Sequence, residues 1–76
     1  MLQLNSNDGS AYLQLALLLE AHGDKGQAFP LFAKTVQLAP RLIEGHIGLG
    51  RLAKGFRDWA TAVREFQTVL VRRGAL

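Results

Sequence analysis

The sequence lacks cysteine, which excludes a disulfide framework and thiolate metal sites. It also lacks a long apolar run. The most apolar stretch, residues 11–21, is interrupted by Gln14 and Glu20 and is too short to span a bilayer. No basic segment precedes this stretch and Asp8 lies just before it, which argues against a signal peptide. These absences slightly favour a soluble, cytoplasmic chain but leave its compartment unknown.

Acidic residues are scarce in the second half of the chain. Residues 1–38 hold two lysines and three acidic side chains, whereas residues 39–76 hold seven basic and three acidic ones, so the halves carry −1 and +4. A basic half attracts acidic partners, nucleic acid among them, although a solvated helix surface is the simpler interpretation. Nucleic-acid binding through the C-terminal half is therefore one alternative function. Trp59, the single tryptophan, has the spacing of a core residue rather than of a platform on which bases stack.

The size and composition of the chain indicate one small folded domain. With 76 residues it hides only about 60% of its unfolded surface, so its stability is marginal. Hydrophobic residues make up 49% of the sequence and no low-complexity tract is present, which disfavours disorder.

An internal repeat organises the sequence. Ala28 and Phe32 return as Ala62 and Phe66, and the match extends in both directions through three further pairs: Leu15 with Leu49, Asp24 with Asp58, and Val36 with Leu70. A fixed period of about 34 residues in a helical pattern is typical of helix-turn-helix arrays. The residue-by-residue correspondence between the two copies is here called the repeat register.

Apolar spacing and helix signals predict four helices, at residues 10–22, 25–38, 42–55 (or 54) and from after Asp58 to about residue 73. Ser10 is the expected N-cap of the first helix, with Asn7 or Asp8 as alternatives, and Asp24 and Asp58 are expected to cap the second and fourth.

Glycine and proline modify these predicted helices. Gly23 is expected to take a left-handed conformation after the first helix. Pro30 falls inside the second helix and is expected to bend its first turns, because it cannot donate to the carbonyl of Gly26. The third helix carries Gly45, Gly48 and Gly50, whose expected use is close approach of helix backbones.

Two helix pairs with this period resemble the tetratricopeptide repeat. The resemblance rests on motif positions that occur in order in both copies: Tyr12, Leu15-Ala16, Ala28, Phe32 and Pro40, then His46, Leu49-Gly50, Ala62 and Phe66. It implies an all-α fold of two stacked helix-turn-helix repeats, residues 9–42 and 43–76, forming a short right-handed solenoid fragment. Residues 1–9 are then a tail or the end of a preceding repeat.

Some positions depart from the family pattern. His46 replaces the aromatic residue, Arg72 stands where Leu38 stands in the first copy, and Gly74 stands where Pro40 does. The array is therefore expected to stop or change at its C-terminus. In the core, Ala16 and Gly50 are expected to permit close approach, with Phe32 and Phe66 filling the space beside them, and His46 is expected to be packed.

Nothing in the sequence favours catalysis, a metal or a cofactor. Ser10, His22 and Asp24 include the residue types of a catalytic triad, but they lie at helix ends, where capping explains them. His22 and His46 have no acidic residue at a metal-ligand spacing. The glycine cluster follows no strand, which disfavours a phosphate-binding loop.

The resemblance implies a concave ligand surface lined by the first helix of each pair. Its expected residues are Leu13, Gln14, Leu17, Glu20, Ala21, Ile47, Gly48, Arg51, Lys54 and Gly55. The Lys and Asn residues with which some family members hold a peptide carboxylate are absent. The expected ligand-binding set is Leu13, Leu17, Glu20, Ile47, Arg51 and Lys54, suited to a protein or peptide segment with hydrophobic anchors and acidic character. Cover of Leu13 and Leu17 by the chain itself or by another copy is the alternative.

The principal prediction is therefore a protein–protein interaction module without enzymatic activity. The alternative to binding another protein is self-assembly, with a homodimer expected because two repeats leave apolar faces uncovered. The residues expected to mediate it are Val63, Phe66, Val69 and Leu70.

Overall fold

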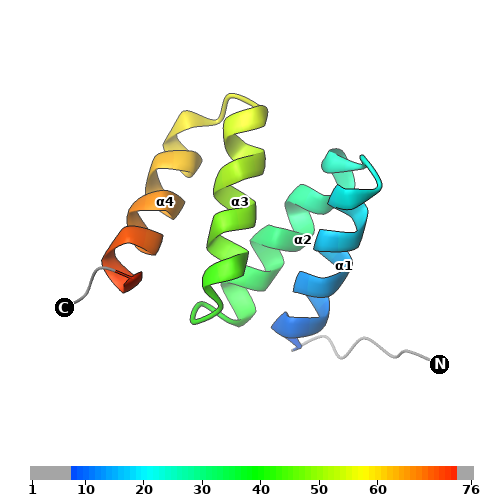
Figure 1. Cartoon of the computed structure of the whole chain (residues 1–76), viewed down its shortest axis with the longest axis horizontal. Helices are drawn as coiled ribbons and strands as arrows, with labels where there is room; N and C mark the ends of the chain where they lie inside the picture. The colour runs from blue at the N-terminus through cyan, green and yellow to red at the C-terminus, as the bar shows by residue number, and fades with distance from the viewer. Residues whose placement is uncertain (1–7, 74–76) are drawn as a thin grey trace.

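The computed structural model describes residues 8–73, and within this range the chain is entirely helical apart from its turns. The helices are α1 (Gly9–Ala21), α2 (Lys25–Leu38), α3 (Ile43–Gly55) and α4 (Trp59–Arg73). They form two packed pairs, α1 with α2 and α3 with α4, and α3 also packs on α2 (Figure 1). The four predicted helices are thus confirmed, and the bounds of α2 match the prediction.

The cap of α1 differs from the expected one. Asp8, not Ser10, precedes the helix, and its Oδ1 atom accepts a hydrogen bond from the backbone N–H of Ala11 at 3.1 Å. A carboxylate at this position satisfies an amide of the first turn that has no partner inside the helix. The helix therefore begins at Gly9, and Ser10 lies exposed in its first turn.

The turn between α1 and α2 has the expected left-handed glycine. Gly23 has a φ of 92°, and the N–H of Asp24 donates to the carbonyl of Leu19 at 2.8 Å. Asp24 then caps α2 through a 3.1 Å bond from the N–H of Gln27. One short turn thus ends one helix and starts the next.

The turn between α3 and α4 has the same geometry without the glycine. Arg57, the equivalent of Gly23 in the repeat register, has a φ of 63°, and the N–H of Asp58 donates to the carbonyl of Ala53 at 2.8 Å. Asp58 accepts from the N–H of Thr61 at 3.3 Å. The sequence period is therefore a structural period, and the second copy places a side chain in a conformation that costs about 1–2 kcal/mol.

The core lies where α1, α2 and α3 meet. Its buried apolar side chains are Leu13, Ala16, Ala28, Phe32, Leu49 and Leu52. Phe32 is 0% exposed, and its ring lies against the backbone of Gly48, where any Cβ would overlap it. One turn earlier, a Cβ at Gly45 would lie 2.9 Å from Cγ2 of Thr35. These two glycines allow α3 to approach α2 closely, as expected.

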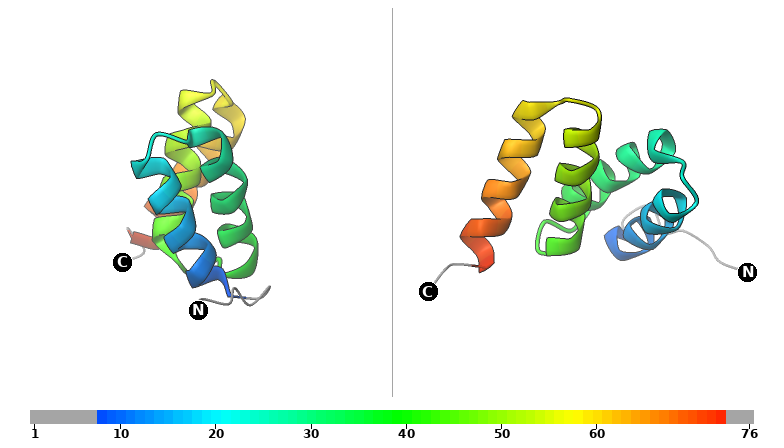
Figure 2. Two further views of the ribbon diagram at one scale, coloured as in Figure 1. Left: turned by 90° about the vertical axis from the view of Figure 1, so that its right-hand side faces the viewer. Right: turned by 45° about the horizontal axis from the view of Figure 1, so that its top comes forward.

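The last helix is less enclosed than the others. Within residues 8–73, α4 packs against α3 alone, at the end of the molecule opposite α1 (Figures 1 and 2). The Phe66 ring packs on Gly50, where an added Cβ would lie 3.1 Å from the ring carbons, yet Phe66 is 36% exposed. The prediction that Phe66 fills the space beside Gly50 is thus confirmed for one side of its ring. Phe32 and Ala16, the equivalent residues of the first copy, both lie in the buried core cluster.

Pro30 lies at an exposed position inside α2, and the helix continues through it to Leu38. The bend expected at this proline stays a prediction.

The different enclosure of the two phenylalanines predicts different costs of truncation. Phe32→Ala should reduce the free energy of unfolding by about 3–5 kcal/mol, the usual cost of emptying a buried aromatic site. Phe66→Ala should cost distinctly less, because part of its ring already faces solvent. Urea titration followed by circular dichroism measures both. Equal losses would show that the two sites are equally enclosed in solution.

The left-handed turn residues predict opposite effects of glycine and alanine. Arg57→Gly should raise the free energy of unfolding by about 0.5–1 kcal/mol, because relief of the left-handed strain exceeds the entropy cost of glycine. Gly23→Ala should lower it by about 1 kcal/mol. Arg57→Ala is the matched control: it removes the same charge but keeps the Cβ, so a gain of equal size in this variant would point to charge rather than backbone conformation.

Candidate functional site

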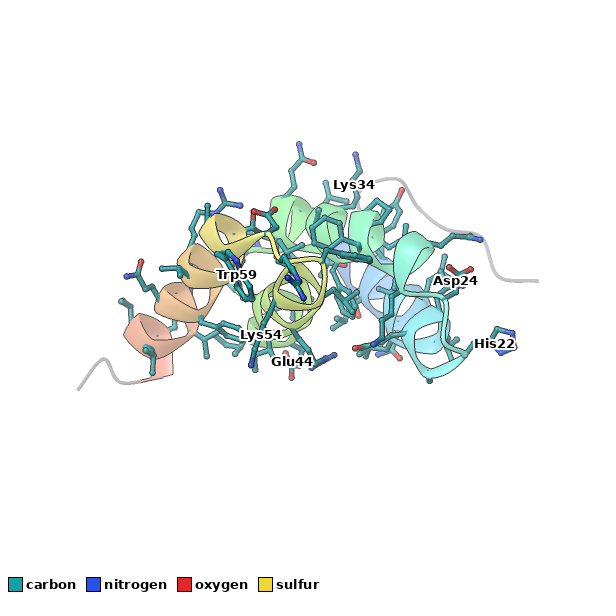
Figure 3. The ribbon with its side chains drawn as sticks, turned by 90° about the horizontal axis from the view of Figure 1, so that it is seen from above. His22, Asp24, Lys34, Glu44, Lys54 and Trp59 are labelled. Atoms are coloured by element: carbon teal, nitrogen blue, oxygen red, sulfur yellow. The ribbon has the colours of Figure 1, made fainter. Side chains whose placement is uncertain are left out.

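The predicted concave surface corresponds to the side formed by α1 and α3, here called the α1/α3 face. Of its six expected residues, Leu17, Arg51 and Lys54 are exposed and Glu20 and Ile47 are half-buried. Lys54 and Glu44 project from α3 on this side, whereas Lys34 projects from α2 on the opposite side (Figure 3).

Two residues expected on this face lie in the core instead. Leu13 is buried in the core cluster, so its side chain is covered by the chain itself, the alternative considered from the sequence. Gly48 is buried against Phe32 on the side of α3 that faces α2. The assignment was wrong for Gly48 because a glycine has no side chain whose polarity could reveal which way the position points.

The centre of the α1/α3 face holds an ion pair. Arg51 donates from Nε to Glu20 Oε2 at 2.7 Å and from Nη2 to Glu20 Oε1 at 2.5 Å. This two-bond geometry joins α1 to α3. Both residues were expected on the surface as separate ligand contacts, but each already satisfies the other's charge. The face consequently offers less free charge than the sequence indicates.

The pair also shifts the protonation equilibria of its members. The hydrogen bond from Arg51 is the main cause that lowers the pKa of the Glu20 carboxyl; partial burial opposes this shift, and the charges of Arg51 and Lys25 reinforce it. The same bond raises the pKa of Arg51. Glu20 is therefore ionised, and the pair intact, at neutral pH and well into the acidic range.

A second polar pair lies buried between α3 and α4. His46 Nδ1 lies 2.6 Å from Glu65 Oε1, and His46 Nε2 lies 2.8 Å from the carbonyl oxygen of Pro40. Because that carbonyl can only accept, Nε2 is the donor in this contact, and Nδ1 is the ring nitrogen that faces the carboxyl. Arg64 Nε donates to Glu65 Oε2 at 3.1 Å. His46 is packed as predicted, whereas its partner Glu65, on the following helix, was not predicted.

Four exposed apolar side chains form a row along α4, here called the α4 stripe: Trp59, Val63, Phe66 and Leu70. Trp59 is 57% exposed and Leu70 is 70% exposed. Their spacing of four, three and four residues places them on one side of the helix. Trp59, expected at a core-facing position, is thus on the surface, whereas Val69, expected on the self-association surface, is buried at 8% because it faces α3.

The repeat register gives the α4 stripe a counterpart in the molecule. Phe29, Phe32 and Val36 of α2 are the equivalents of Val63, Phe66 and Leu70. In α2 these residues face α3. Phe32 lies on Gly48, and Cγ2 of Val36 is 3.6 Å from the place that a Cβ at Gly45 would occupy. The Phe29 ring packs edge-on against the ring of Phe56, which follows α3, with ring centroids 5.5 Å apart. The α4 stripe therefore repeats a helix-packing surface at a place where no described helix covers it.

Other candidate sites are weak. A shallow depression is lined by α4 residues alone, Arg64, Gln67, Thr68, Val71 and Arg72, so it is not a cavity between elements. Residues 8–73 contain no group of three His, Asp or Glu side chains placed to hold a metal ion. Among the same residues, no helix is both long and apolar enough to traverse a bilayer. Of the basic residues of the second half, Arg51 and Arg64 are engaged with glutamates, which reduces the charge free for nucleic acid.

Comparison with known proteins adds no relative. No protein-family model matches the sequence, and neither the curated proteins nor the solved structures include a match.

The Glu20–Arg51 pair predicts a pH-dependent coupling energy. A double-mutant cycle of Glu20→Gln and Arg51→Gln should give a coupling of about 0.5–1 kcal/mol at pH 7, since Arg51 is half exposed. Because the folded-state pKa of Glu20 is lowered, this contribution is complete above the unfolded-state pKa of about 4.3 and is lost as pH falls through the folded-state value. Urea titrations between pH 7 and pH 2.5 measure it. A coupling that does not change over this range would mean that the pair does not form in solution.

Proposed function

We propose that this chain is a protein–protein interaction module of the tetratricopeptide-repeat type, without a catalytic role, and that its principal binding surface is the α4 stripe. One observation carries the proposal: the stripe repeats, in the second copy, the side of α2 that packs against α3. A surface shaped to receive a helix is present on α4 without a described helix on it.

The chemistry of the stripe supports this choice. Its four side chains are apolar, two of them are aromatic, and contiguous exposed apolar surface marks sites of protein association. Trp59 stands where α2 has Lys25, so the stripe is more apolar than its counterpart at this end. Tryptophan is also among the residues that most often dominate interface energies.

The α1/α3 face is the weaker candidate for the binding surface. It was the surface implied by the family resemblance, but Leu13 is buried and the charges of Glu20 and Arg51 are paired with each other. A partner that used this face would contact mainly Leu17, Ile47 and Lys54. Of these three, Leu17 is the exposed large apolar side chain, whereas the α4 stripe has four.

Self-association is a second candidate, favoured by the spacing of the stripe. The intervals of four, three and four residues are symmetric about the point between Arg64 and Glu65. Two antiparallel α4 helices would therefore oppose Trp59 with Leu70 and Val63 with Phe66, giving an aromatic–aliphatic contact in each pair. A closed two-fold interface of this kind is the commonest way in which identical chains associate.

Selection from a displayed library of helical peptides tests which surface binds. Peptides enriched on the wild-type chain should bind Val63→Glu at least tenfold more weakly, because the charge lies in the middle of the stripe. The same peptides should bind Leu17→Asp, a matched charge on the α1/α3 face, with unchanged affinity. Circular dichroism confirms that both variants fold. The reverse pattern would assign binding to the α1/α3 face and refute the choice of α4.

A further inference from the structure

We infer that the α4 stripe receives an α-helix of a partner protein that carries two glycines three residues apart on its packed side. The inference rests on the proposed function and specifies the partner of the same surface. The contact between α2 and α3, here called the template contact, serves as the model for this binding, because the α4 stripe is the equivalent in the repeat register of the side of α2 that packs on α3.

The template contact requires glycine. On α3, Gly48 lies against the Phe32 ring so closely that any Cβ there would overlap it. Gly45, one turn earlier, faces Thr35 and Val36, and a Cβ at this position would lie 2.9 Å from Thr35 Cγ2. Because Gly45 and Gly48 have no side chain, they leave a groove on one side of α3 into which the Phe32 ring of α2 packs.

Phe66 presents the same ring to an uncovered side. One part of its ring packs on Gly50 of α3, and the remainder accounts for its 36% exposure. Phe32 has the same position in the first helix pair and is fully buried because Gly48 covers it. A helix that covers Phe66 in the same way needs a glycine opposite the ring. Gly45 of α3 faces Thr35 and Val36, whose equivalents in α4 are Val69 and Leu70, so the covering helix needs a second small residue opposite these two.

None of the helices described in residues 8–73 is free to make this contact. In the repeat register, the α1 equivalents of Gly45 and Gly48 are Ala11 and Gln14, and a Gln14 side chain would stand where the ring must enter. Of the four helices, α3 alone has two glycines three residues apart, and both are buried against α2. The described helices of a second copy therefore cannot repeat the template contact, and the inferred partner helix has a sequence different from those of α1–α4.

The charge of the stripe limits the partner further. Its four residues carry no charge, and helical spacing places Gln67, Ala60, Val71 and Arg64 along the solvent-facing edge of the row, where Arg64 is already bonded to Glu65. A charged side chain on the packed side of the partner would be desolvated without a counter-charge, which is costly. The partner helix thus combines the two glycines with otherwise apolar side chains on the side that meets α4.

A peptide copied from α3 tests the inference. The probe is a fluorescein-labelled peptide of residues 41–55, held helical by a hydrocarbon cross-link that replaces Ile47 and Lys54, because an isolated helix of this length is marginal. By helical spacing these two positions lie away from the side that carries Gly45 and Gly48. Fluorescence anisotropy with the full chain should show saturable binding of this peptide.

Two alanine variants of the peptide test the glycine requirement. The Gly48→Ala peptide should bind at least tenfold more weakly than the parent, because a Cβ would meet the phenylalanine ring. The Gly50→Ala peptide is the matched control: it carries the same substitution, with the same gain in helix propensity, on the opposite side of the helix, and should bind no more weakly than the parent. If the Gly48→Ala peptide binds as well as the parent, the glycine requirement is wrong although the stripe still binds a helix.

Variants of the full chain place the peptide on the stripe. Val63→Glu should abolish binding, and Val71→Glu should leave it unchanged, because Val71 is 69% exposed but lies roughly 110° around α4 from the stripe. If the parent peptide does not bind and light scattering gives the mass of a single chain, 8.3 kDa, the inference fails. If the wild-type chain is a dimer that Val63→Glu converts to a monomer, a second copy occupies the stripe and the inference is overturned, while the choice of α4 as the binding surface stands.

Discussion

The contact between the Phe32 ring and the backbone of Gly48 is the constraint on which the arrangement of the two helix pairs depends. Phe32 is the largest fully buried apolar side chain among the described residues, and Gly48 is the position that lets α3 lie against it. A side chain at residue 48 would push α3 away from α2 and separate the pairs. This contact between the pairs has no free volume for even a single added carbon atom.

Much of the fold could be predicted because the signals that determine it are local and occur twice. The repeated Asp24 and Asp58 caps located two helix starts, and the repeated Ala-Phe positions located the packed side of α2. The first cap was assigned to Ser10 instead of Asp8, since both residue types cap equally well and two lie close together. Arg57 shows the opposite case: its left-handed conformation was not predicted, since its residue type gives no signal for it, and only its register with Gly23 could have indicated it.

The site was less predictable because it depends on which residues meet across helices. Glu65 and His46 lie on different helices, and a buried glutamate looks like a surface glutamate in a sequence. Glu20 and Arg51 were both placed on one face, but their pairing changes that face from charged to largely neutralised. Val69 and Trp59 were exchanged between core and surface, since both continue the apolar pattern of α4 and only the direction of α3 decides between them.

The limited enclosure of α4 has a thermodynamic consequence. Within the described residues this helix is held by α3 alone, largely through Phe66 on Gly50 and the buried bond from Glu65 to His46, so it belongs to the part of the molecule that opens most readily. A partner that binds only the closed form stabilises it by an amount that grows with the logarithm of the partner's concentration. Occupancy of the α4 stripe and persistence of the fold would therefore be linked: the helix that presents the proposed binding surface is also the one whose integrity a bound partner would maintain.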